Sequence, residues 1–383
     1  MSLLQSNPVY VVGIGLHRYQ FPTDTPYVQL GLTAVREALA DAGLTWPQVP
    51  LAVVGTAAIG MAAGRVMLRH LGSTGFEVMQ VENASASGST AFRTACLQVA
   101  AGEHAVALAL GVDKFGDGRR AAGKDGLAPL SPTAHIPLVK FALLTRKLMQ
   151  DHGLTEADLA RVAVKNHGNA ALNPHAQFRK PRTLEQVLAS PRIAGALTGM
   201  MCTPRGEGAA AVIVASDAGL DRLGLDRRRA VRVLSSVSMS ERLPEDLPVG
   251  VPPIVDLVRQ SSTAALRQAG LAADALDLIE LHDAFSIEEL VYAEAMGACA
   301  PGDAPGALAR GEWAIGGRCA VNASGGLIGM GHPLGPTGIG QVAEIVRQLR
   351  GEASGRQQPG ARTGLAHMIG LGTMAVAHVL HKE

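Results

Sequence analysis

The feature that most constrains the fold of this chain is an internal repeat. The segment Asp-Ala-Gly-Leu at 41–44 has a counterpart, Gln-Ala-Gly-Leu, at 268–271, and each ends a stretch with helical spacing of apolar residues. At the same distance beyond each glycine lies a short apolar strand, at 51–54 in one half and at 278–281 in the other. Echoes that recur in the same order predict a duplicated α/β unit.

A further pair of matching segments carries polar residues. Residues 83–85 and 322–324 both read Asn-Ala-Ser, and both precede a Gly-containing stretch and a predicted helix. A duplicated domain places its equivalent loops around one shared cleft. We therefore expect the unusual residues of both halves to converge.

The remaining pattern supports an α/β fold with an insertion. Apolar runs at 9–15, 105–111 and 208–215 lack alternation, which is typical of strands covered on both faces. Residues from about 114 to 205 are instead rich in Gly, Pro, His and Asn. Further helices are expected at 31–43, 91–100, 137–151, 155–169, 255–270 and 339–351, and a strand at 231–234. The predicted domains are an N-terminal half (1–113 and 206–230), a loop domain (114–205) and a C-terminal half (231–383).

Charge and cysteine usage exclude several classes of protein. With 34 basic and 33 acidic residues the net charge is +1, so nothing indicates binding to nucleic acid or an anionic membrane. No apolar run reaches the roughly 20 residues of a membrane span. The cysteines lie far apart without metal-like spacing, which indicates a reduced, cytoplasmic protein without a metal site. They are Cys96, Cys202, Cys299 and Cys319.

Ser85 lies where a run of small, turn-forming residues meets a predicted helix. Unpaired N–H groups and the helix dipole at such a junction favour a developing negative charge. The simpler interpretation is an N-cap, because Ser, Asn and Gly are common at helix starts.

Three more segments place unusual residues at strand or helix ends. His282 ends a buried strand, His332 lies in a glycine-rich run at 322–338, and Gly370 lies in a glycine-containing segment at 368–374 that also fits a tight turn between strands. The 322–338 run lacks the Gly-Lys-Ser/Thr ending of a phosphate loop, so we exclude that interpretation. A lone histidine at such a place is more often structural than catalytic, and the glycines leave backbone N–H groups accessible.

These motifs together resemble the thiolase superfamily, in particular the sterol-carrier-protein-x type thiolases and the archaeal acetoacetyl-CoA thiolases. The resemblance rests on Gly-His-Pro-Leu-Gly-Pro-Thr-Gly at 331–338, on His-Asp-Ala-Phe at 282–285 and on the Lys-Asn-His-containing stretch at 165–174. It covers nearly the whole chain. It implies the thiolase fold, a duplicated α/β/α/β/α five-layer architecture with an inserted loop domain.

The resemblance also implies roles for the four candidate site residues. His332 corresponds to the base beside the nucleophile, and His282 to a donor in an oxyanion hole for the thioester or enolate. The backbone N–H groups of Gly370 and Ser85 correspond to the second oxyanion hole. No acidic partner that would orient His332 is identifiable from the sequence.

The departures from the family pattern concern thiols. Ser85 stands where the family has its nucleophilic cysteine, and Ala284 and Met368 stand at two positions where family members carry an acid/base cysteine. A thiolate is a far better nucleophile at neutral pH than an unassisted hydroxyl. The resemblance therefore leaves the reaction open, including whether Ser85 is natural or introduced.

Three functions remain. The first is aldol or retro-aldol chemistry on a β-hydroxyacyl-CoA, which needs a base and an oxyanion hole. The second is acyl transfer of the thiolase type with Ser85 as nucleophile, activated by His332. The third is a non-catalytic scaffold that binds acyl-CoA. The implied ligand is a CoA thioester as substrate, with no further cofactor. The implied partners are a second copy of the chain and, as in thiolase-like aldolases of lipid metabolism, a small OB-fold, zinc-ribbon protein.

Overall fold

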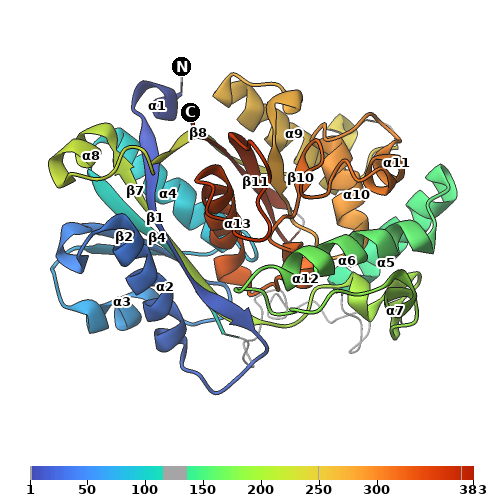
Figure 1. The fold of residues 1–383 in the computed structure, drawn as a ribbon, viewed down its shortest axis with the longest axis horizontal. Helices are drawn as coiled ribbons and strands as arrows, with labels where there is room; N and C mark the ends of the chain where they lie inside the picture. Colours follow the sequence, from blue (N-terminus) through green and yellow to red (C-terminus); the bar gives the residue numbers. More distant parts are fainter. Residues whose placement is uncertain (1, 115–135, 249, 372) are drawn as a thin grey trace.

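The computed structural model describes residues 2–114, 136–248, 250–371 and 373–383. Ten strands form one mixed sheet (Figure 1). In the N-terminal half the order is β3-β2-β4-β7-β1, and in the C-terminal half it is β10-β9-β11-β12-β8. The first group comprises β1 (Val9–Gln20), β2 (Leu51–Gly55), β3 (Glu77–Val81), β4 (Val106–Asp113) and β7 (Glu207–Ser216). The second comprises β8 (Val231–Ser240), β9 (Leu278–Glu280), β10 (Ala320–Val321), β11 (Thr363–Gly370) and β12 (Met374–His381).

The two halves have the same topology. Counted within each half, the strands lie in the order third, second, fourth, fifth, first. The first strands, β1 and β8, pair antiparallel through Tyr10 with Arg232 and Val11 with Val231. The duplication predicted from the repeats is therefore confirmed.

The strands of the two halves form two β layers of this sheet, and four long helices form three helical layers around and between them. Helix α2 (Tyr27–Ala42) covers the N-terminal strands, and α9 (Pro253–Ala269) packs on β8 and β12 of the other half. Between the halves lie α4 (Ser87–Ala101) and α13 (Leu334–Leu349), which pack against each other, and α13 contacts strands of both halves. The α/β/α/β/α order predicted by the resemblance is thus present (Figure 1).

The helices of the inserted segment lie beside the C-terminal half. They are α5 (Ile136–His152), α6 (Glu156–Ala171) and α7 (Leu184–Leu188), followed by the hairpin β5 (Arg192–Ala194) and β6 (Leu197–Thr198). The helices predicted at 137–151 and 155–169 are confirmed as α5 and α6. Part of the loop domain predicted for 114–205 lies outside the described residues, and its boundaries remain a prediction.

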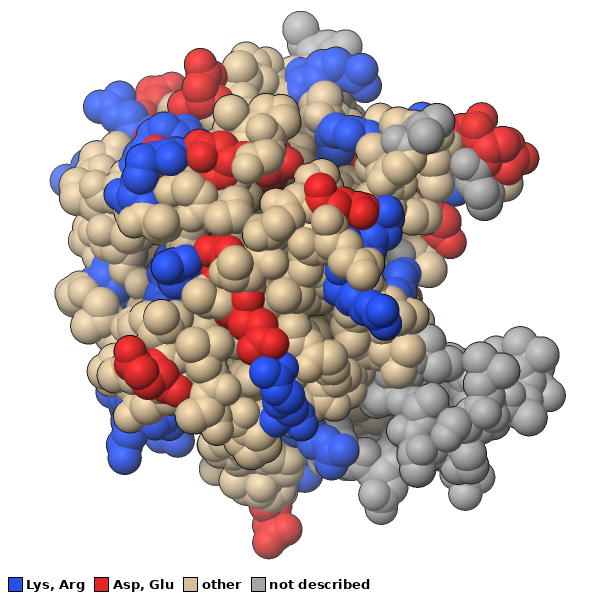
Figure 2. All heavy atoms as spheres, turned by 90° about the vertical axis from the view of Figure 1, so that its right-hand side faces the viewer, with Lys and Arg blue, Asp and Glu red and all other residues tan. Residues whose placement is uncertain are grey.

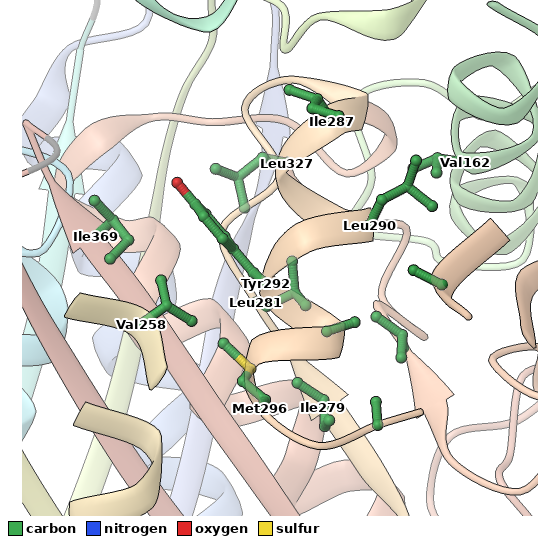
Figure 3. Packing of buried hydrophobic residues seen from close by; sticks show 14 of the residues in the cluster. Val162, Val258, Ile279, Leu281, Ile287, Leu290, Tyr292, Met296, Leu327 and Ile369 are labelled. Carbon is green, nitrogen blue, oxygen red and sulfur yellow. The ribbon is translucent and has the colours of Figure 1, made fainter. Parts of the chain in front are cut away.

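The remaining helices are short or peripheral, apart from α10, which packs on α6 and α9. They are α1 (Leu3–Ser6), α3 (Ala63–Leu68), α8 (Asp217–Leu223), α10 (Ser286–Ala295), α11 (Ala304–Ala309) and α12 (Gly326–Gly329). Apolar side chains from α10, α6, α9 and the nearby strands form the core of this region (Figure 3). Over the described residues, no helix is both long and apolar enough to cross a bilayer.

Basic and acidic side chains are interspersed on the face that carries the inserted helices (Figure 2). Among the described residues, several form ion pairs, which include Lys147 with Asp151, Arg161 with Asp158, and Arg192 with Glu156. Exposed pairs of this kind contribute little to stability, typically about 0–1 kcal/mol each. They are consistent with a surface of nearly balanced charge.

Several predicted boundaries were wrong. The helices expected at 31–43 and 91–100 begin at Tyr27 and Ser87, and the strand expected at 231–234 continues to Ser240. The helix expected at 339–351 begins at Leu334, and the strand expected at 9–15 continues to Gln20.

For the helix expected at 339–351 the reason is identifiable. Gly335, Pro336 and Gly338 suggested a loop, but a side chain at position 338 would overlap the hydroxyl of Ser89 on α4. These glycines permit close approach of two helices.

Candidate active site

Ser85 lies in a tight corner between β3 and α4. Ala84 has a left-handed backbone with φ of 49°, an uncommon conformation for a residue with a Cβ. The hydroxyl of Ser87 fixes the corner by accepting from the amide of Asn83 (2.9 Å) and donating to the carbonyl of Ala84 (2.6 Å). The corner therefore sets the direction of Ser85.

Ser85 is not the N-cap of α4. The helix begins at Ser87, its N-cap is Ala86, and that cap makes no side-chain hydrogen bond. The hydroxyl of Ser85 instead lies 3.0 Å from Nε2 of His332. The N-cap interpretation is therefore wrong.

His332 lies between α12 and α13 and is oriented by a hydroxyl group. Its Nδ1 lies 2.9 Å from Oγ1 of Thr337, and the Thr337 hydroxyl donates to the carbonyl of Pro333 at 2.5 Å. A hydroxyl has one proton, so Thr337 must accept from Nδ1–H. Nε2 of neutral His332 then carries a lone pair that accepts from Ser85, which is the configuration of a general base.

His282 faces His332 from the end of β9. The two ring centroids are 5.4 Å apart and the ring planes are nearly perpendicular, at 88°. Nδ1 of His282 lies 3.1 Å from Oε1 of Glu288, and the His282 residue is 6% exposed. The two histidines therefore lie in the same site, but Nδ1 of His282 contacts a carboxylate and Nδ1 of His332 contacts a hydroxyl.

Gly370 ends β11 next to the Ser85 corner. A methyl group at position 370 would overlap the carbonyl oxygen of Asn83 and approach Cβ of Ala86. The chain turns after Gly370 and returns as β12 at Met374, which confirms the tight-turn interpretation of 368–374. The structure therefore brings the predicted site residues together, while their catalytic roles remain predictions.

Two polar residues of this site were missed in the sequence. Thr337 lies inside the glycine-rich run that we had quoted for His332, and a hydroxyl within one helical turn of the histidine was the available signal. Glu288 lies three residues after Phe285 and accepts from its amide at 2.9 Å. The N-cap of α10 is Phe285 and not a hydroxyl or amide residue, so the sequence lacks a complete capping-box signal for Glu288.

A buried network holds the His332 loop in place. Asp283 accepts from the amide of Leu327 (2.6 Å) and from Nδ2 of Asn166 (2.8 Å), which ties α12 to α6. Burial, followed by the nearby charge of Glu289, raises the pKa of Asp283 well above its usual value. The acidic residue of His-Asp-Ala-Phe therefore has a positional role.

Asp113 fixes the start of α13 from the opposite half. Its carboxylate accepts from the hydroxyl of Thr56 (2.7 Å) and the amides of Ala58 (2.8 Å) and Gly335 (2.6 Å). Burial still raises the pKa of Asp113, against the lowering effect of these hydrogen bonds. Gly335 lies three residues beyond His332, so Asp113 helps to set the position of that histidine.

The positions at which the resemblance implies thiols hold none here. Ala284 and Met368 are both buried, and the thiol of Cys202 donates to the carbonyl of Thr198 at 3.3 Å. Burial, followed by the charge of Glu288, raises the pKa of Cys202 to about 12. Cys202 is therefore a neutral thiol at pH 7.

The fold and this site define the class of thiolase-fold enzymes of CoA thioesters. A thiolase N-terminal domain model matches residues 14–186, and a thiolase C-terminal domain-like model matches residues 252–382. The chain belongs to the thiolase family.

Two curated relatives show the branch. Sterol carrier protein 2 of Gallus gallus is 35% identical over 98% of this chain and 72% of its own length. The benzoylsuccinyl-CoA thiolase subunit BbsB of Thauera aromatica is 32% identical over 96% of both chains. The resemblance to sterol-carrier-protein thiolases is thereby confirmed.

Two solved structures extend the comparison. The Ltp2-ChsH2(DUF35) aldolase matches with a TM-score of 0.84 and 26% identity, covering 98% of this chain and 97% of that one. Human mitochondrial 3-ketoacyl-CoA thiolase matches with a TM-score of 0.74 over the full length of both chains, at 19% identity, and so shows the fold alone.

Proposed function

We propose that this protein cleaves or forms the carbon–carbon bond β to a CoA thioester by retro-aldol or aldol chemistry on a β-hydroxyacyl-CoA. The observation that carries the proposal is the pair of facing histidines, one set up as a base, at a site where positions 85, 284 and 368 hold no thiol. Retro-aldol cleavage needs a base and an enolate acceptor but no covalent acyl-enzyme. The similarity to an aldolase structure also supports it.

The steps follow from the positions of the side chains. The substrate hydroxyl replaces that of Ser85 at Nε2 of His332 and gives up its proton there. The O–H electrons form the new carbonyl while the Cα–Cβ bond breaks, and the bonding pair becomes the enolate of the departing acyl-CoA. His282 donates to the enolate oxygen and stabilises its charge. Protonated His332 then returns the proton to Cα.

A product assay tests the proposal. The purified protein is incubated with a β-hydroxyacyl-CoA, alone and with a DUF35 companion protein of the kind named in the aldolase complex. We expect a carbonyl compound and a shortened acyl-CoA in equal amounts, and their loss in His332→Ala. Absence of carbonyl product in every condition would argue strongly against the aldolase.

One observation favours acyl transfer as the second candidate. The 3.0 Å contact between the Ser85 hydroxyl and Nε2 of His332 is the geometry of a base-activated serine. An acyl-CoA would then leave an acyl group on Ser85, visible as a mass increase of the intact protein that is absent in Ser85→Ala. This test applies whether the serine is natural or introduced.

We also propose that the chain assembles into a homodimer through β3. This strand is at the edge of the sheet, and Val78, Met79 and Val81 along it are only partly buried. A half-buried edge strand can pair with a second strand. Light scattering on the purified protein should give twice the mass of the 39.6 kDa chain. A monomer at all concentrations would contradict this assembly.

A further inference from the structure

Glu288 is a buried carboxylate directly behind His282. Its Oε1 accepts from Nδ1 of His282 (3.1 Å) and from the hydroxyl of Tyr292 (3.0 Å), and its Oε2 accepts from the amide of Phe285 (2.9 Å). The Glu288 side chain has no exposed area. Because His282 is the proposed hydrogen-bond donor to the substrate, its contact with Glu288 affects how it can act on the substrate.

The neighbouring glutamate shows what is unusual about Glu288. Glu289 is equally buried, but it has an ammonium partner, since Nζ of Lys165 lies 3.1 Å from its Oε1. Among the described residues, Glu288 forms its ion pair with a histidine, His282, and not with a lysine or arginine. An ionised carboxylate in such a place is costly unless a positive charge compensates it.

The apolar surroundings of Glu288 increase its need for a compensating positive charge. Tyr292, which donates to Glu288, belongs to the same apolar cluster as Leu327 and Ile369 (Figure 3). Charge–charge interactions are stronger in such surroundings than in water. The protonation state of His282 is therefore tied to the charge of Glu288.

A count of protons gives the inference. Nδ1 of His282 faces a carboxylate, which only accepts, so Nδ1 carries a proton. If His282 also donates from Nε2 to the substrate oxygen, it must carry a second proton. We infer that Glu288 is a positioning residue that holds His282 as an imidazolium, so that its Nε2–H donates to the thioester or enolate oxygen. This inference rests on the proposed function.

Three titratable groups close to the His282–Glu288 pair are neutral at pH 7. Burial, followed by the charge of His282, lowers the pKa of His367 to about 3, and His367 lies 2.7 Å from the hydroxyl of Ser261. Burial keeps the thiol of Cys202 and the phenol of Tyr292 protonated by raising the pKa of each.

Two further groups complete the surroundings. His332 directs Nδ1 to the hydroxyl of Thr337 and Nε2 to the hydroxyl of Ser85. Asp283, next in sequence to His282, has a raised pKa and points its carboxyl group to Leu327 and Asn166. The carboxylate of Glu288 and the imidazolium of His282 therefore form the local charge pair.

Nitrogen NMR of the histidine side chains tests this directly. Spectra are recorded at pH 7 on the wild type, with His282 assigned by the loss of its signals in His282→Asn. We expect both ring nitrogens of His282 to be protonated in the wild type and one in Glu288→Gln. A singly protonated His282 in the wild type would overturn the inference.

Kinetics with the β-hydroxyacyl-CoA form the second arm. Glu288→Gln should lower kcat about 100-fold with little change in KM, because an oxyanion donor acts mainly in the transition state. It should have no further effect in a His282→Asn background. Tyr292→Phe removes a neutral donor from the same carboxylate and is the matched control, expected within about three-fold of wild type.

The two arms separate the possible failures. If the wild type cleaves the substrate and Glu288→Gln cleaves it equally well, Glu288 has no such role and the proposed function stands. If Tyr292→Phe and Glu288→Gln lose activity and melting temperature equally, the role is structural and the inference is wrong. If the wild type cleaves nothing, the proposed function fails, and the NMR result still decides the state of His282.

Discussion

The imidazole rings of His282 and His332 face each other at a centroid separation of 5.4 Å, with their planes at 88°. One ring is held by a carboxylate and the other by a hydroxyl. These partners assign a different proton configuration to each ring. One site can thus hold a hydrogen-bond donor and a base of the same residue type.

Removing the Thr337 hydroxyl should impair the base. In Thr337→Val, Nδ1 of His332 loses its acceptor, so the ring is no longer held in the tautomer with a free Nε2 lone pair. We expect kcat for carbon–carbon cleavage to fall about 10- to 100-fold, within the range of a general-base contribution. Thr337→Ser keeps the hydroxyl and should retain most of the activity. Equal losses in both variants would show that the methyl group, and not the hydroxyl, is important.

A thiol at position 85 should change the reactivity of the protein. We expect Ser85→Cys to form an acyl-enzyme and to be inactivated by iodoacetamide, because its thiolate would lie beside His332. The wild type should resist the reagent, since burial raises the pKa of Cys202, Cys299 and Cys319 to about 12 and also raises the pKa of Cys96. Residual activity after alkylation, together with the intact mass, measures both effects. Rapid inactivation of the wild type would mean that one of its own thiols serves the reaction.

The contact between α4 and α13 should not tolerate a methyl group. In Gly88→Ala the new Cβ would overlap the carbonyl oxygen of Gly335, so α4 and α13, which begin just after Ser85 and His332, must separate. We expect a loss of about 1–3 kcal/mol in the free energy of unfolding and a clear loss of activity.

Gly168→Ala is the matched control for this substitution. Gly168 is also within a helix, α6, and a Cβ there would meet nothing within 4 Å. Alanine should be neutral or stabilise the protein by up to about 1 kcal/mol. Denaturant unfolding measures both variants, and equal stability of the two would refute the steric explanation.

Acid should weaken a link between the halves at Asp41. Its carboxylate accepts from Ile14, Arg229 and Arg350 at 2.7–2.9 Å. Burial alone would raise the pKa of Asp41, but the hydrogen bonds and charges of the two arginines outweigh it and hold that pKa below its usual value. A lowered folded-state pKa gives stability that is present above the unfolded value of about 3.9 and is lost as the pH falls through the folded value.

Unfolding measurements at several pH values test this link. Asp41→Asn should cost about 1–3 kcal/mol at pH 7, and the difference from wild type should shrink toward pH 3. Asp217→Asn breaks an exposed pair with Arg227 and should change stability by less than about 0.5 kcal/mol. A difference for Asp41→Asn that stays constant with pH would contradict a role for its charge.

Much of the fold could be predicted because its signals are local or repeated. The continuous apolar runs marked β4 and β7, and the glycine after each amphipathic helix marked the ends of α2 and α9. The edge strand β3 was missed because its partly exposed residues lack a buried run.

The sequence predicted the site residues that lie in recognisable motifs, but not the hydrogen bonds between them. Ser85, His282 and His332 were found because they lie in unusual local sequences, but their protonation depends on Thr337 and Glu288. These two contacts could not be deduced, because a hydrogen bond between side chains is set by how the loops fold. The N-cap interpretation of Ser85 failed for the same reason, since its partner is 247 residues away.

The second Asn-Ala-Ser segment, at 322–324, follows β10 as the first follows β3, the third strand of each half. Ser324 is buried, and its hydroxyl donates to the interior carboxyl group of Glu280 at 2.5 Å. Of two related corners, one therefore presents its serine to a histidine and the other uses its serine as internal support. The two copies differ in what surrounds each serine hydroxyl, so we expect one active site in each chain, at Ser85, and none at the equivalent Ser324.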